Sequence, residues 1–491
     1  MKSLLRRCLP VLLALLFGAC SAPNNNDYAI GKNDIADLDG QKIAVMSGSL
    51  QEIIVDKLCP QAEVLRLNSA SEVITSVATG QADFFLMDST SIIGAHIEQR
   101  GLMVAFTTEQ VAGDVAFGLN PKDTALCNEL NEFLQRYRAD GRWSQLNSRW
   151  TQGDVETVVM QHPQLNPDAP TLRVGTNDFF PFSFIQNGRY AGFEAQLIED
   201  FCAETGRNIE FLTIDFNGLI AACASRKIDV IASSMYITEE RAKQILFSDP
   251  YYHSGTVCVA RSTQAVAKKS FGTAIKESFH NNLIEDNRWK IIANGLWETV
   301  VISILAILLG TIFGAFVCWM RMSQRKVLNG IAKVYVEIIR GVPILVLLML
   351  MFYVIFAQSA ISARWVAIIA FAMNFGAYVS EMFRSGIESV EKGQTEAGLA
   401  MGFTKLQTFI YFVVPQAAKR IIPIFKGEAV SLFKNTSVVG FIAIQDLTKA
   451  SEIIRARTFD AFFPLIVISI IYFILAWLFG KLLDCLANKI A

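Results

Sequence analysis

The sequence predicts an α/β domain followed by an all-α membrane domain with five spans. The chain has 491 residues, of which 52% are hydrophobic and only 18% are charged. Soluble proteins normally carry about a quarter charged residues. The apolar excess lies mostly after residue 295, in segments long enough for a bilayer. Before that point, short apolar strands alternate with amphipathic helices, which is typical of a sheet with parallel strands.

The net charge of −1, without long basic runs, excludes nucleic acid as an expected partner. The chain has nine cysteines, and five of them lie in the α/β stretches in an odd set without regular spacing. We expect these five to be buried free thiols. The four histidines are scattered and no CxxC pair occurs, so the sequence predicts no metal site.

The first twenty residues have the features of a secretory signal. Lys2, Arg6 and Arg7 precede a short apolar run, and Gly18-Ala19-Cys20 follows it. This ending resembles the lipobox of bacterial lipoproteins, in which the cysteine is acylated. Lipidation of Cys20 is therefore expected, with an unlipidated cut or an uncut anchor as the alternatives. In each case the residues that follow are exported.

Two α/β stretches, residues 27–151 and 171–265, are separated by a linker at 152–170 that is rich in proline. The apolar patterns predict one helix and several strands. The helix is expected at 51–58 and the strands at 42–46, 82–87, 171–175 and 229–233. Residues 266–290 form a second, juxtamembrane linker.

Several motifs in these stretches resemble bilobed amino-acid-binding proteins of bacteria. The first half of that family is similar to residues 173–182 (Arg-Val-Gly-Thr-Asn-Asp-Phe-Phe-Pro-Phe), 215–220, 227–231, 237–243 and 247–252. Its second half, which forms lobe 2 and returns to lobe 1, is similar to residues 37–45, 47–51, 80–83 and 141–143. The resemblance implies a bilobed α/β fold with a ligand cleft between the lobes.

The order of the two halves is reversed relative to the family, because the usual second half comes first. We interpret this as one circularly permuted binding domain, since the linker at 152–170 is long enough to join the original termini. The alternative is two separate half-domains that each pair with another chain.

The resemblance also implies which side chains would hold an amino acid. Arg241 would bind the carboxylate, with help from Ser234 and Ser49, because a guanidinium matches a carboxylate in two hydrogen bonds. Asp88 would take the ammonium from the other lobe, and Asp178 would assist it. Phe179 and Phe216 would pack on the ligand.

Each of these positions also has a simpler interpretation. Arg241 is alternatively a solvated charge and Asp88 a helix cap, and the two phenylalanines are alternatively core residues. Tyr236 departs from the family, which usually has a small hydroxyl residue there, and it is expected to reshape the carboxylate end of the pocket.

Five membrane spans are expected in the domain at 291–491. They lie at about 296–319, 342–361, 364–382, 416–444 and 461–482. The fourth is the weakest, because Pro423 and several charges interrupt it, and we interpret it as a broken helix near the translocation path. Lys449, Arg455 and Arg457 then fall on the outer side, against the positive-inside rule.

The cytoplasmic loop at about 385–415 resembles the EAA loop of ATP-binding-cassette (ABC) importer permeases. The residues that carry the resemblance are Glu396, Ala397, Gly402 and Pro415, while Gly398 replaces the family's second alanine. The motifs at 335–343 and 433–437 are similar to permeases for polar amino acids. In that family the loop docks on a cytoplasmic ATPase subunit.

Together the resemblances imply a non-enzymatic transport subunit in the bacterial inner membrane. It would capture an L-amino acid outside the cell and translocate it inward, and the sequence does not specify which amino acid. The chain contains no GxxxxGK[ST] phosphate loop. ATP and Mg²⁺ would therefore bind to a separate ATPase dimer, and this chain is expected to carry no cofactor.

A second permease chain is also implied, with a homodimer as the simplest arrangement and a heterodimer as the alternative. An amino-acid-gated channel or a membrane sensor could use the same binding fold. A channel of this kind would insert its pore between the two halves of the binding domain, whereas here the membrane segments follow both halves.

Overall fold

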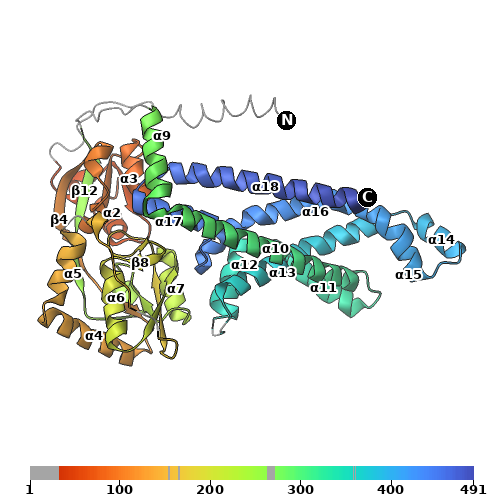
Figure 1. Ribbon diagram of the computed structural model, residues 1–491, viewed down its shortest axis with the longest axis horizontal. Coiled ribbons are helices and arrows are strands. Elements are labelled where there is room, and N and C mark those ends of the chain that lie inside the picture. Colours follow the sequence, from red (N-terminus) through yellow and green to blue (C-terminus); the bar gives the residue numbers. More distant parts are fainter. Residues whose placement is uncertain are drawn as a thin grey trace.

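The computed structural model describes residues 32–490 apart from 153–154, 164–165, 263–270, 358 and 360. Figure 1 shows an α/β part at one end and a bundle of long helices that extends away from it. The expected signal segment and Cys20 lie outside the described residues.

The α/β part has two lobes, each built on a five-stranded sheet. Lobe A contains a sheet in the order β2-β1-β3-β12-β4. Its strands are β1 (Lys42–Met46), β2 (Glu63–Leu67), β3 (Phe84–Asp88), β4 (Leu102–Val115) and β12 (Tyr252–Arg261), and its α-helices are α2 (Leu50–Leu58) and α3 (Ala70–Ala78). β1, β2 and β3 run parallel, while β12 is antiparallel to both of its neighbours.

Lobe B contains the second sheet, in the order β11-β5-β10-β6-β9. Its strands are β5 (Gly118–Leu119), β6 (Thr171–Thr176), β9 (Asn208–Thr213), β10 (Val230–Ile231) and β11 (Leu246–Phe247), with a hairpin of β7 (Phe184–Gln186) and β8 (Arg189–Ala191). Its α-helices are α4 (Thr124–Ala139), α5 (Arg142–Thr151), α6 (Phe193–Glu204), α7 (Leu219–Ala224) and α8 (Glu239–Ala242). The strands and the helix expected from the apolar patterns are all present, with ends shifted by a few residues.

The chain passes between the lobes twice, from β4 to β5 and from β11 to β12. The two passages lie side by side, since the amide of Tyr251 donates to the carbonyl of Val115 and the amide of Ser248 to that of Phe117. β5 belongs to the first α/β stretch but pairs with β10 and β11 of the second. β12 belongs to the second stretch but pairs with β3 and β4 of the first.

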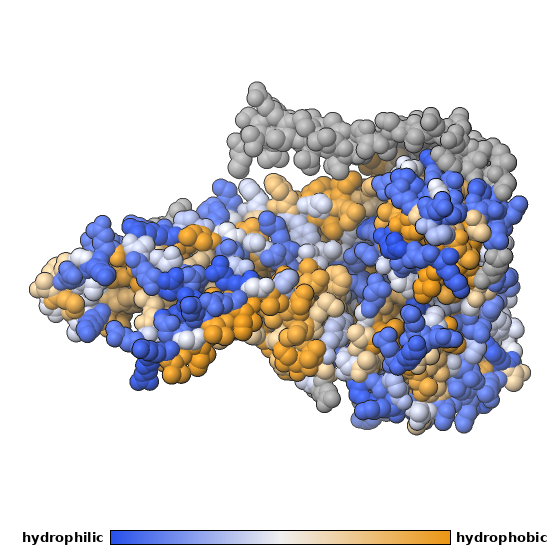
Figure 2. Space-filling model, turned by 180° about the vertical axis from the view of Figure 1, so that it is seen from behind, coloured by the Kyte–Doolittle hydropathy of each residue, from blue (hydrophilic) through white to orange (hydrophobic). Residues whose placement is uncertain are grey.

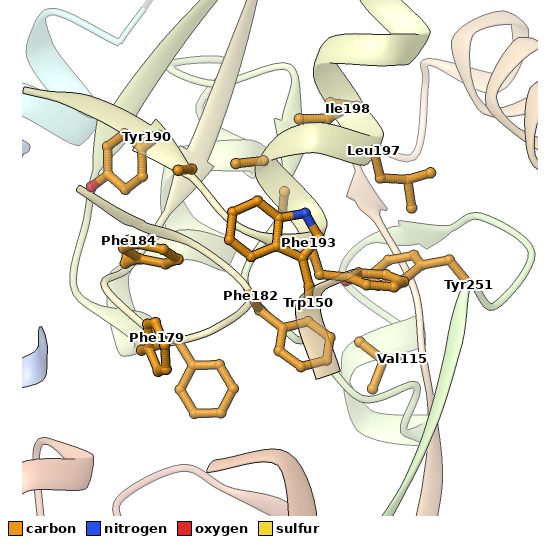
Figure 3. Close-up of a cluster of buried hydrophobic side chains, with 14 of the residues drawn as sticks. Val115, Trp150, Phe179, Phe182, Phe184, Tyr190, Phe193, Leu197, Ile198 and Tyr251 are labelled. Carbon is orange, nitrogen blue, oxygen red and sulfur yellow. The ribbon is translucent and has the colours of Figure 1, made fainter. Parts of the chain in front are cut away.

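The core of lobe B is aromatic and joins both stretches. Figure 3 shows Phe193 close to Phe182 and Tyr251, with ring centroids 5.2 and 6.2 Å away. Trp150 lies edge-on to Phe184 at 5.9 Å. Because Trp150 comes from the first stretch and the four other rings come from the second, burial of these rings stabilises the assembly of the two stretches.

The helical part begins with α9 (Phe271–Phe279) and continues through the membrane domain. Its α-helices are α10 (Trp289–Arg321), α11 (Lys326–Gly341), α12 (Ile344–Leu350), α13 (Ala363–Glu388), α14 (Lys392–Ala400), α15 (Lys405–Thr408), α16 (Val414–Asn435), α17 (Leu447–Thr458) and α18 (Phe463–Ile490). α10, α13 and α18 are long and apolar enough to cross a membrane among the described residues. Figure 2 shows apolar residues gathered on the middle of the helical part, with polar residues beyond them.

The span expected at 342–361 differs from the structure. Here α11 and α12 form a bent pair at an angle of 107°, and together they would count as a fourth span. Val342 is extended and Pro343 caps α12. Proline disfavours helical geometry in the residue before it, so the chain turns at this point.

The break expected inside the fourth span is also absent at Pro423. α16 is one helix of 22 residues that continues through Pro423 and ends at Asn435. A proline within a helix removes a single backbone donor. Packing of α16 against α13 and α18 keeps the segments before and after Pro423 in one helix. The interruption comes later, in a 3₁₀ segment at Thr436–Ile442.

Glu194 at the start of α6 connects lobe B to the second passage between the lobes. Its carboxylate accepts hydrogen bonds from the amide and hydroxyl of Ser234, at 2.6 and 3.1 Å, and from the hydroxyl of Tyr251. Burial raises the pKa of Glu194 from 4.5 to about 7, although these hydrogen bonds oppose the shift.

We expect the stability of the protein to fall as pH rises from about 4.5 to about 7. The unfolded state releases the Glu194 proton near pH 4.5 and the folded state only near 7, so the loss reaches ~3 kcal/mol. Thermal unfolding of the full chain in detergent between pH 5 and 8 measures this loss. Glu194→Gln should remove the part of this loss that comes from Glu194. If the stability of both proteins falls equally with pH, Glu194 is not its source.

Candidate functional site in the cleft between the lobes

Arg241 lies where the two lobes meet, because the short helix α8 places it there. Thr238 caps α8 by accepting a hydrogen bond from the amide of Arg241. The guanidinium donates to the carbonyl of Tyr236 in lobe B, at 2.9 Å, and to the carbonyl of Gly48 in lobe A, at 2.8 Å. It also lies 5.3 Å from the centre of the Phe216 ring. Arg241 is therefore engaged with both lobes, which excludes its interpretation as a solvated charge.

Asp88 is the last residue of β3 and faces the same cleft. Its Oδ1 accepts a hydrogen bond of 2.8 Å from the side-chain amide Nε2 of Gln51 and another from the hydroxyl of Tyr236. It forms no capping bond with the segment that follows, so the helix-cap alternative is wrong. Burial raises the pKa of Asp88, against the opposing effects of Tyr236, Gln51 and Arg241.

We call this group the cleft cluster, and it brings the predicted ligand residues of the two lobes together. Its members are Gly48, Gln51, Asp88, Phe216, Tyr236 and Arg241. Burial lowers the pKa of Arg241 while Asp88 opposes that shift, so the two charges act on each other. The lobes also meet directly, because a side chain at Gly48 would lie 2.5 Å from Asn217 of lobe B.

Tyr236 forms hydrogen bonds with both charged residues of the cluster, Asp88 and Arg241. Its hydroxyl bonds to Asp88, while its carbonyl accepts from Arg241. A ligand that contacted both Asp88 and Arg241 would therefore have to replace both of these bonds. The departure of Tyr236 from the family pattern thus places a bulky residue at the centre of the site.

The other predicted site residues lie outside the cleft cluster. Ser49 caps α2 by accepting from the amide of Glu52. Ser234 is bonded to Glu194. Phe179 packs on Phe182 at 6.0 Å and is 8% exposed, as its core interpretation expects. Burial raises the pKa of Asp178, and the charges that act on it are those of Lys449 and Glu452 on α17 and of Asp215.

The outer helix α17 joins the membrane part to both lobes (Figure 1). Lys449 bonds to Asp215 of lobe B at 2.5 Å, and Arg455 bonds to Glu72 of lobe A at 2.9 Å. The guanidinium of Arg457 lies 4.2 Å from the ring centre of Phe180. These are the basic residues that run against the positive-inside rule, and their partners in the α/β part explain their position.

Two further contacts strengthen this docking. Arg100 of lobe A donates to the carbonyls of Thr458 and Phe459, at 2.9 and 2.6 Å. Lys227 of lobe B donates to the carbonyl of Phe356 near the end of the bent pair. The α/β part therefore rests on the membrane helices through each of its lobes.

The loop expected to contact an ATPase forms α14, α15 and the start of α16 at the far end of the bundle. Glu396 and Ala397 lie on α14, and Gly402 follows it with a φ of +88° that favours glycine. A side chain at Gly398 would lie 2.6 Å from Thr408, so α14 packs closely against α15 there. Pro415 lies in the first turn of α16.

A cavity of about 520 Å³ lies beside the edge strand β9 of lobe B, away from the cleft cluster. It is lined by residues of the linker, β8, α6, β9 and α10, and by none of the cleft cluster. Among the described residues, no group of three or more histidine, cysteine or acidic side chains could hold a metal. The seven cysteines in the described ranges are free thiols.

Sequence reasoning missed Gln51, Glu194 and Lys449. Gln51 lies in the first turn of α2, two residues after the Ser49 cap, so a buried polar residue after a cap was the available signal. Glu194 is an acid in the first turn of the mostly buried helix α6. The only signal from Lys449 was that a basic residue was expected on the outer side of the membrane, against the positive-inside rule.

Known proteins match both parts of the chain. Residues 172–401 match the family model of bacterial extracellular solute-binding proteins, family 3. The L-cystine transport system permease protein TcyB of Bacillus subtilis is 35% identical over 211 residues, which cover 43% of this chain and 88% of the relative. This chain belongs to the permease family of amino-acid ABC transporters.

Two further transport proteins are similar to this chain. A putative glutamine permease, GlnP of Rickettsia typhi, is 31% identical across 40% of this chain and 92% of its own length. A solved amino-acid ABC transporter with histidines is 32% identical over 45% of this chain and 99% of that chain, with a TM-score of 0.39. The solute-binding match starts in β6 and runs past β12 into the membrane helices, so it omits most of lobe A.

The hydrogen bond between Tyr236 and Asp88 can be tested by removing one oxygen. Tyr236→Phe should lower the free energy of unfolding by ~1.5–3 kcal/mol, because the buried carboxylate loses a donor. Tyr411→Phe is the control, since Tyr411 is 66% exposed. Chemical denaturation of the full chain in detergent measures both, and equal stabilities would show that the bond contributes nothing.

Proposed function

We propose that this chain is a fused receptor and permease of an amino-acid importer. The observation that carries the proposal is the pair Arg241 and Asp88, which come from facing lobes and interact in one cleft on a chain of the amino-acid permease family. The α/β part would capture an L-amino acid outside the cell. The membrane part would then translocate it inward.

Circular permutation of the binding domain is part of this proposal. Its support is the exchange of β5 and β12 between the two stretches of sequence. Each stretch thereby completes the sheet of the other within a single chain, as a permuted domain requires. Linker 152–170 would replace the original termini.

Ligand binding would close the two lobes around a zwitterion. The carboxylate would take the two donors of Arg241 that now face the carbonyls of Tyr236 and Gly48. The ammonium would take Asp88 in place of the Tyr236 hydroxyl. Because these partners lie on different lobes, closure gains contacts that neither lobe offers alone.

A separate cytoplasmic ATPase dimer would bind ATP and Mg²⁺ and drive the cycle. Glu396 and Ala397 on α14 would dock on it, with Gly402 and Pro415 setting the direction of the flanking segments. Two copies of this chain would form the pathway in the bacterial inner membrane, crossed by five spans in each copy. An acyl group on Cys20 would add an anchor on the outer face.

Arg241→Ala should weaken amino-acid binding by about 2–5 kcal/mol, since it leaves a ligand carboxylate unpaired. Isothermal titration of the full chain in detergent against the twenty amino acids measures this. Arg66→Ala is the control, because Arg66 pairs with Glu52 and Asp56 at the surface of lobe A. Unchanged affinity in Arg241→Ala would remove Arg241 from the site.

Glu396→Lys should abolish ligand-stimulated ATP hydrolysis by the assembled transporter while amino-acid affinity stays unchanged. The charge reversal lies on the exposed face of α14, far from the cleft. Glu391→Lys makes the same change five positions earlier, and it should retain most of the activity. Equal losses in the two variants would mean that position 396 has no special role.

A further inference from the structure

Lys449 belongs to helix α17 of the helical part, and its ammonium lies against lobe B of the α/β part. Only 7% of the residue is exposed. Its ammonium bonds to Asp215 at 2.5 Å and to Glu452, one turn further along α17, at 2.9 Å. Asp215 forms no capping bond with its own helix, so this carboxylate is available to Lys449.

A third carboxylate, Asp178, lies near enough for its charge to interact with the same ammonium. Asp178 feels the charges of Lys449, Glu452 and Asp215, and burial raises its pKa to about 7. Its Oδ1 is buried and has no hydrogen-bond partner among the described residues. Two carboxylates thus bond to a single ammonium and a third interacts with its charge. One buried oxygen of that third carboxylate lacks the donor that a buried carboxylate normally has.

This acidic group adjoins the cleft cluster. Asp215 is followed directly by Phe216, whose ring lies against Arg241. If the zwitterion of the proposed ligand lies between Arg241 and Asp88, a ligand side chain that extends past Phe216 would reach Asp215. Lys449 therefore bonds to the residue that directly precedes a member of the cleft cluster.

We propose that Lys449 is a specificity-determining residue that the membrane half contributes to the amino-acid site. Its ammonium holds the cation position between Asp178 and Asp215, so a ligand with a positively charged side chain binds there only by displacing it. The site then favours amino acids whose side chains carry no positive charge. This inference rests on the proposed amino-acid-binding function.

Lys449→Met in the full chain tests the proposal directly. Removal of the tethered ammonium should raise the affinity for arginine and lysine at least tenfold, while the affinity for glutamine changes less than threefold. Isothermal titration in detergent measures all three ligands. The double variant Lys449→Met with Asp215→Asn should lose most of the gain for arginine, because the carboxylate that receives its side chain is gone.

Arg455→Met is the matched control, since Arg455 lies on the same helix, is equally buried and pairs with Glu72 outside the cleft. It weakens docking without freeing Asp178 or Asp215, so it should change all three affinities by one common factor. If amino acids bind and Lys449→Met changes the three affinities in the same way as Arg455→Met, the inference is wrong and the proposed function still stands. Absence of binding of all twenty amino acids to every protein would overturn both.

Discussion

Neither sheet of the α/β part is complete without a strand from the other stretch of sequence. β12 lies between β3 and the edge strand β4 in one sheet, and β5 lies between β10 and β11 in the other. Two adjacent passages between the lobes follow from this exchange. In the proposed importer, these two adjacent antiparallel connections would form the hinge about which the lobes open and close.

The sequence predicted those features that depend on local pattern. β1 and β6 were predicted from apolar runs. Arg241 and Asp88 were expected in one site from the resemblance of their motifs to a family, and the fold brings them together where the lobes meet. The bend between α11 and α12 was missed because hydropathy measures only the length of an apolar segment. Pro343 marked the position of the bend, but its angle depends on packing against α13.

Features that depend on contacts between distant segments were beyond sequence reasoning. Ser234 was expected near a ligand carboxylate, yet Glu194 takes its amide and hydroxyl. Asp178 was expected beside the ligand ammonium, yet its neighbours lie on α17. In both cases the competing partner is more than fifteen positions away, so no local pattern could reveal it.

The basic residues of α17 show how a topological rule can be satisfied by a partner domain. A cation on the outer side of a membrane is unusual when only the bilayer is considered. Here Glu72 and Asp215 neutralise Arg455 and Lys449, and the ring of Phe180 lies against Arg457. The charge pattern of the helix therefore reflects the protein surface above it.

Because α17 and the two lobes it contacts belong to one polypeptide, their encounter is intramolecular. A tether of this kind keeps the local concentration of one partner near the other in the millimolar range. Contacts as modest as two ion pairs and a few backbone bonds are then enough to keep the parts engaged. In the proposed importer each membrane domain would be covalently joined to its receptor domain. The rate of uptake would then not depend on the concentration of free receptors that the cell secretes.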